Sequence, residues 1–144
     1  MAEQRFPSYV REIAINTGAI ATPIWSVLGF IEKNAIKHKL EEDNRFENSD
    51  DGFGASRVNG QMSEVDISGV YVKGDPAFDY IKATEYDLTK KNDNMVKITD
   101  YDGSSLIFNK CAILVEETGG DTQKTASISG KIMLGGKPTI TPAT

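Results

Sequence analysis

A strand-to-helix junction near the middle of the chain constrains the fold more than any other stretch. Before it, residues 61–72 alternate with period two, as a half-buried strand does. Gly74 permits a sharp change of direction, Asp75 can accept hydrogen bonds from free backbone N–H groups, and Pro76 suits the first helical position. The following residues at three- and four-residue spacing share one face: Ala77, Phe78, Ile81, Thr84 and Leu88. This pattern predicts one helix over about 76–88 between two groups of strands.

Several other segments have the length and the alternation of strands. They are residues 22–31, 34–43, 95–101, 105–117 and 125–134. Asp102-Gly103 between two of them predicts a hairpin turn. We therefore expect a mainly β (α+β) fold, in which two antiparallel sheets pack face to face as a β-sandwich and the single helix flanks them.

The chain length of 144 residues suits a single domain over 1–144. Within it we expect an N-terminal arm over 1–18, a long loop over 44–60 and a C-terminal tail over 135–144. A loop of that length in a small domain is usually functional or disordered, and this one contains apolar side chains that a purely solvated loop does not need. Phe46, Phe53 and Val58 are therefore expected to dock either on this domain or on a neighbouring copy. Together with Asp50, Asp51 and Arg57 they are the candidates if the contact is with another subunit.

No motif in the sequence predicts a reaction. Cys111 is the only cysteine and His38 the only histidine, which leaves no cysteine zinc site and no partner for a histidine ligand. Adjacent carboxylates such as Glu41-Glu42 would point to opposite faces of a strand, and the acidic residues of the 44–60 loop lack the register of a calcium-binding loop. We expect no catalytic residues, no metal site and no cofactor, and a buried reduced thiol at Cys111.

Charge and hydropathy patterning limit the partners. The net charge is −5, and an acidic chain without a basic cluster is poorly suited to grip nucleic acid. The first ten residues lack the apolar core of a signal peptide, and residues 19–31 are too short and too interrupted to span a bilayer. We expect a protein that is made in the cytoplasm, stays soluble there and has no membrane partner.

Two stretches taken together resemble a known family. They are Asn16-Thr17-Gly18-Ala19 with Thr22-Pro23-Ile24-Trp25 and Gly29-Phe30, and then Tyr71 to Ile81 around the helix start. The later pattern Thr125 to Ile132, ahead of a glycine-rich end, is similar too. In this order, with a long polar segment between them, they resemble the tail tube (major tail) proteins of long-tailed bacteriophages that infect Gram-positive bacteria. The stretch Glu47 to Asn59 departs from the family pattern.

The resemblance implies a structural virion protein of the tail, which assembles into hexameric rings that stack as a hollow conduit for genome ejection. It also implies contacts of the long loop and the terminal arms with neighbouring subunits and rings. The partners would be further copies of the chain and other tail proteins, such as the tape measure, terminator and distal tail proteins. DNA would pass through the lumen without specific binding.

Physical reasoning is consistent with such a tube. Open edges of a sheet can pair with other chains and cause aggregation. Pairing with copies of the same chain in a closed ring removes these open edges. Six copies at −5 each would carry about −30, which keeps a duplex away from the wall. Two sets of small or acidic side chains are candidates for the lumen lining: Glu64, Asp66 and Ser68, or Ser127 and Ser129.

Two alternative functions stay open at this point. One is another virion component on the same fold, either a tail terminator or the tube of a contractile or bacteriocin-like particle. The other is a ligand-binding β-sandwich module, which would need an exposed aromatic platform. Trp25, the only tryptophan, lies in a segment that is apolar on both faces and is a poor candidate for one.

Overall fold

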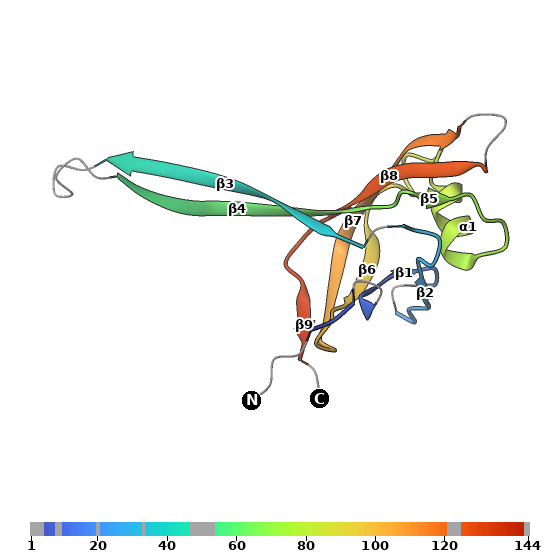
Figure 1. Ribbon diagram of the computed structural model, residues 1–144, viewed down its shortest axis with the longest axis horizontal. Coiled ribbons are helices and arrows are strands. Elements are labelled where there is room, and N and C mark those ends of the chain that lie inside the picture. Colours follow the sequence, from blue (N-terminus) through green and yellow to red (C-terminus); the bar gives the residue numbers. More distant parts are fainter. Residues whose placement is uncertain are drawn as a thin grey trace.

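A computed structural model describes residues 5–7, 10–19, 21–32, 34–46, 54–120 and 125–142, with the backbone alone at 44–46 and at Ala55. One group of strands consists of β1 (Glu12–Asn16), β2 (Trp25–Val27), β6 (Asn94–Thr99) and β9 (Thr139–Thr141). A second group consists of β3 (Ile36–Phe46), β4 (Gly54–Asp66), β5 (Gly69–Val70) and β8 (Ser127–Leu134). The long strand β7 (Ser105–Gly119) joins the groups, and α1 (Pro76–Ala83) is the helix (Figure 1).

All pairings between the described strands are antiparallel, in the order β2-β1-β6-β7-β8-β4-β3. Strand β7 belongs to two sheets: residues Ser105 to Cys111 pair with β6, and residues Ala112 to Gly119 pair with β8. The second sheet consists of the latter half of β7 with β8, β4 and β3. We call it the arm sheet, because β3 and β4 continue beyond it as the long hairpin described below. The expected pair of packed antiparallel sheets is therefore confirmed, with one strand shared between them.

The core lies between the two sheets and under the helix. Its fully buried side chains include Ile15 and Ile98 from the β1–β6 side, and Val65 and Ile132 from the arm sheet. From α1, Phe78 packs edge-on against Phe30 and Tyr71, with ring centroids 5.2 and 4.7 Å away. These contacts fix the helix against the sandwich.

The helix begins where the sequence predicts. The Asp75 carboxylate accepts a hydrogen bond from the Ala77 N–H at 3.0 Å, Pro76 is the first helical residue, and Gly74 has φ +96°. The predicted end at residue 88 is wrong, because the helix stops at Ala83. The Thr84 hydroxyl donates to the Ile81 carbonyl at 2.6 Å, and the chain then continues through turns that leave Leu88 78% exposed.

The N-terminal region also differs from expectation. Residues 12–16 form β1, whose Ile13, Ala14 and Ile15 are buried, so this part of the expected arm is a core strand. The predicted strand 22–31 shrinks to β2, because the Asn16 side chain accepts hydrogen bonds from the N–H groups of Gly18 and Ile24 and holds the connection as a turn. At the other end, residues 139–141 of the expected tail pair with β7 as β9.

The prediction of a loop over 44–60 is wrong over most of that range. Strands β3 and β4 form one long hairpin whose pairing runs from Ile36↔Val65 to Phe46↔Gly54, with a register shift at Glu41/Glu42. Only Ser63–Asp66 of β4 also pair with β8, so the rest of the hairpin extends away from the body (Figure 1). We call residues 40–46 and 54–61 the arm. None of its described side chains is buried, so the sequence there lacks the alternation of a half-buried strand and resembles a loop.

Candidate functional site

The arm exposes two open strand edges. Strand β3 is at the end of the strand order, and β4 has no second strand partner among the described residues before Ser63. Apolar side chains are exposed along the hairpin: Leu40 at 48%, Val58 at 57% and Met62 at 55%. An edge strand with unpaired N–H and C=O groups can pair with a strand of another chain, and exposed apolar side chains beside it can become buried in that contact.

The predicted subunit-contact residues divide between described and undescribed parts of this arm. Arg57 and Val58 lie on β4 and are exposed, and their register partners are Asp43 and Glu42. Phe46 ends β3, at the far end of the ladder. Asp50, Asp51 and Phe53 lie outside the described residues. The sequence thus did not reveal that this region is a hairpin, and its contact with another subunit stays a prediction.

The outer face of the arm sheet brings the predicted lumen residues together. Glu64 and Asp66 alternate along β4 with the buried Val65, and the register pairs Asp66 with Lys131 of β8. Ser127 and Ser129 follow on the same face of β8, at the two-residue period of Lys131. Ser68 lies between β4 and β5. The two candidate sets therefore belong to one surface.

That surface is less acidic than the sequence suggests. The Lys37 ammonium lies 3.4 Å from the Asp66 carboxylate, and the Lys131 ammonium lies 3.8 Å from the Glu64 carboxylate. Both lysines come from strands next to β4, so only the sheet register places them there. The carboxylates predicted to face the lumen are thus compensated locally by cations.

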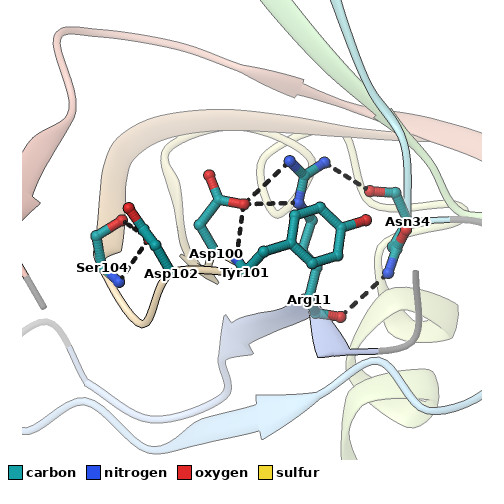
Figure 2. A network of polar contacts seen from close by, with 6 residues as sticks. All are labelled: Arg11, Asn34, Asp100, Tyr101, Asp102 and Ser104. Carbon is teal, nitrogen blue, oxygen red and sulfur yellow. Dashed lines mark hydrogen bonds and ion pairs between the residues drawn. The ribbon is translucent and has the colours of Figure 1, made fainter. Parts of the chain in front are cut away.

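A polar network anchors the base of the arm to the opposite sheet (Figure 2). The Arg11 guanidinium donates to Oδ1 of Asp100 from Nε at 3.2 Å and from Nη2 at 3.1 Å, and from Nη1 to the Asn34 carbonyl at 3.3 Å. The Asn34 side chain donates back to the Arg11 carbonyl at 3.2 Å. The guanidinium also lies over the Tyr101 ring, 4.6 Å from its centroid. This network holds the segment entering β3 against the β6–β7 turn.

An open groove lies between the base of the arm and the first half of β7. It has a volume of about 610 Å³, and its apolar floor consists of Leu106, Phe108 and Leu134. On one wall, Nδ1 of His38 is 2.7 Å from the Ser63 hydroxyl and 3.0 Å from the Gln61 amide nitrogen. Lys137 and Pro138 form the other wall. The lone histidine is therefore part of a hydrogen-bonded groove wall.

The groups that could carry chemistry are arranged as structural side chains. Cys111 is fully buried, and this burial raises the pKa of its thiol to about 11, so almost none of it is thiolate at neutral pH. In the described ranges, no three His, Cys, Asp or Glu side chains gather as a metal site would require. No helix among those same residues is long and apolar enough to cross a membrane. Trp25 is half-buried, with the Lys97 ammonium 5.9 Å from its ring centroid.

Comparison with known proteins finds likeness at the level of the fold. No protein-family model and no curated protein sequence matches the chain. Among solved structures, it is similar to a chain in the tail of an empty gene transfer agent particle resolved with C6 symmetry, with a TM-score of 0.77 and 11% identity over 95% of this chain and 99% of that one. A chain in the virion of a native gene transfer agent particle gives a TM-score of 0.71 at 11% identity, over 95% and 99%.

Two other particles provide further examples of the fold at lower TM-scores. The tube-terminating cap of an anti-feeding prophage gives a TM-score of 0.58 at 14% identity, over 99% of this chain and 95% of that one. The sheath–tube complex of an extracellular contractile injection system gives 0.59 at 11%, over 98% and 94%. The described residues thus form a β-rich fold with one helix, similar to the fold of these tail and tube chains.

Proposed function

We propose that this protein is a structural subunit of a virion tail tube, whose copies form rings that stack into a conduit for the genome. The observation that carries the proposal is the arm, a hairpin with open strand edges and exposed apolar side chains. It extends from a body whose fold is similar to that of a chain in a gene transfer agent tail. A surface of this kind is a liability in a monomer and a means of assembly in an oligomer. The proposal assigns the protein no reaction and no cofactor.

The arm sheet supplies a mode of ring closure. Its strand order ends at β3 on one side. On the other side, the latter half of β7 has no strand partner after Cys111 among the described residues; the segment after α1 lies beside it, with the Lys91 carbonyl bonded to Ile113 N–H and Glu85 bonded to the Thr118 hydroxyl. When edge β3 of one copy lies against edge β7 of the next, the contact is head-to-tail, and it closes into a ring if the rotation between copies divides a full turn. We propose six, a number supported by the C6 symmetry of the gene transfer agent tail.

The outer face of the arm sheet is our proposed lumen lining, with Glu64, Asp66, Ser127 and Ser129 on it and Ser68 at its end. Its paired lysines and carboxylates offer DNA no continuous cationic track, while the net charge of −5 per chain keeps the wall repulsive overall. DNA would therefore slide without specific binding. The tape measure, terminator and distal tail proteins remain the proposed partners, and phages of Gram-positive hosts remain the proposed source.

A second candidate function is another tube component, either the terminator of the tube or the tube of a contractile particle. The likeness to an anti-feeding prophage cap and to a contractile injection system favours it. The higher TM-score with the gene transfer agent tail favours the tail tube. Electron microscopy of the purified protein separates the two, because a tube subunit polymerises into long tubes whereas a terminator stops at rings.

The decisive variant shortens the arm. Glu41 and Gly60 are register partners, so replacing residues 42–59 by Asn-Gly should close the hairpin with a two-residue turn. Among the described residues removed, none contributes to the buried core. We expect a circular dichroism spectrum that is still dominated by β structure and cooperative melting, with no rings or tubes in micrographs. Tubes of normal length from this variant would contradict the proposal.

A further inference from the structure

The turn that follows α1 presents two apolar side chains to solvent. Tyr86 is 92% exposed and Leu88 is 78% exposed. Isolated exposed apolar residues are ordinary, but this pair lies two residues apart at the apex of one turn. We call Tyr86, Asp87 and Leu88 the knob.

The knob is held rigidly by hydrogen bonds around it. Oδ1 of Asp87 accepts from the N–H groups of Thr89 and Lys90, and the Lys91 ammonium donates to the Glu85 carbonyl at 2.7 Å. The Asn92 side chain donates to the Leu88 carbonyl at 3.2 Å. A preorganised turn loses little conformational entropy when it docks, so its exposed side chains can contribute their burial to binding.

The knob lies beside one edge of the arm sheet, and one wall of the groove lies at the other edge. The knob segment touches the latter half of β7, through the Lys91–Ile113 and Glu85–Thr118 hydrogen bonds. The groove lies between the first half of β7 and the start of the β3–β4 hairpin, which provides the wall with His38, Gln61 and Ser63. In the order β7-β8-β4-β3 these are the two edges that the proposed ring brings together. The knob of one copy would then face the groove of the next.

The two surfaces are also chemically complementary. The groove floor of Leu106, Phe108 and Leu134 is apolar, as are the side chains of Tyr86 and Leu88. Lys137 on the groove wall is exposed and has no ion pair with a described residue, while the knob carries the carboxylate of Asp87. The His38–Ser63–Gln61 cluster offers polar partners for a phenol hydroxyl.

We infer that the occupant of the groove is the knob of a second copy of this chain, with Tyr86 and Leu88 as the anchoring side chains of the lateral contact. This inference rests on the proposed function, because it uses the head-to-tail ring. It adds the specific side chains that determine which edges meet. Heterologous contacts of this kind, with different patches on the two copies, generate rings when the rotation closes.

The first test compares two serine double variants by light scattering over a concentration series. Tyr86→Ser with Leu88→Ser should raise the concentration at which rings form by about tenfold or more, as expected when anchoring side chains are lost. The matched control is Ile24→Ser with Val27→Ser, which removes two apolar side chains, 61% and 46% exposed, beside the other sheet. It should leave ring formation unchanged. Equal effects of the two variants would overturn the inference.

The second test is cross-linking of Leu88→Cys combined with Lys137→Cys by a short bis-maleimide. Head-to-tail contact predicts a ladder of cross-linked oligomers, whereas either single variant should give no species above a dimer. Cys111 is buried with a pKa of about 11 and does not interfere. If the parent chain forms rings but the double variant gives no ladder, the inference fails and the tube proposal stands. If the parent chain forms no rings at all, the tube proposal fails.

Discussion

Replacing Arg11 by Ala removes the centre of the network at the base of the arm. The change deletes two hydrogen bonds to the Asp100 carboxylate, one to the Asn34 carbonyl and the stacking on Tyr101. It also leaves Asp100 without its ion-pair partner, in a site where the side chains of Arg11 and Asp100 are only 18% and 31% exposed. The loss therefore exceeds that of an ordinary surface ion pair.

The magnitude follows from these contacts. A hydrogen bond to a charged group contributes about 1.5–3 kcal/mol and a cation–π contact at a partly exposed site about 0.5–1 kcal/mol. The contacts share one guanidinium and are partly solvated, so they do not add in full. We expect the free energy of unfolding to fall by about 2–3 kcal/mol. With an m-value of about 2 kcal/mol/M, this moves the urea midpoint down by roughly 1–1.5 M.

The assay is urea unfolding followed by circular dichroism at a concentration where the chain is monomeric. The matched control is Lys37→Ala, because the Lys37 side chain is 64% exposed and its pair with Asp66 spans 3.4 Å. We expect that variant to stay within about 0.5 kcal/mol of the parent. If Arg11→Ala shifts the midpoint no more than Lys37→Ala does, the network does not anchor the arm and the reasoning is refuted.

Three further predictions concern the fold. Asp75→Ala removes the helix cap at Ala77 N–H and should lower the free energy of unfolding by about 1 kcal/mol, whereas Asp75→Asn should retain most of it; equal losses would argue against capping. Gly130→Ala places a Cβ 2.0 Å from the Leu114 carbonyl oxygen and should cost about 3 kcal/mol or more, while Gly29→Ala meets nothing within 4 Å and should cost far less. The Cys111 thiol should resist a maleimide at pH 8 until urea unfolds the chain. Its pKa is about 11 in the folded state and 9.0 in the reference state, so the folded state holds the proton to higher pH. The free energy of unfolding should therefore decline as the pH rises from 9 to 11. Stoichiometric labelling of the native protein would contradict the burial.

The helix start shows what local sequence can predict. The helix start depends on the backbone geometry of Gly74 and Pro76 and on the side-chain cap from Asp75. Because these residues are adjacent in the sequence, the start could be predicted from them alone. The helix end depends instead on Thr84, whose hydroxyl bonds back to Ile81, and on the Asp87 turn after it. Leu88 fits the helical spacing of apolar residues in the sequence, yet it is exposed in the structure. The spacing does not take account of the side-chain hydrogen bonds that end the helix before it.

The arm and its anchor show what local sequence cannot predict. Alternation reveals a strand only when one face is buried. No described side chain of the arm is buried, so its ladder of backbone hydrogen bonds leaves no hydrophobic signal in the sequence. Arg11 and Asp100 are 89 residues apart, and no pattern in the sequence indicates that they pair. On the arm sheet, alternation correctly separated Glu64 and Asp66 from Val65, but only the register could reveal the lysines beside them.

Light scattering coupled to size exclusion, over a concentration series of the purified full chain and followed by negative-stain microscopy of each peak, tests the central claim most directly. For a tube subunit we expect a concentration-dependent species of about six chain masses that appears as rings in face view and grows into tubes. A monomer at every concentration, with no rings or tubes in any micrograph, would contradict it.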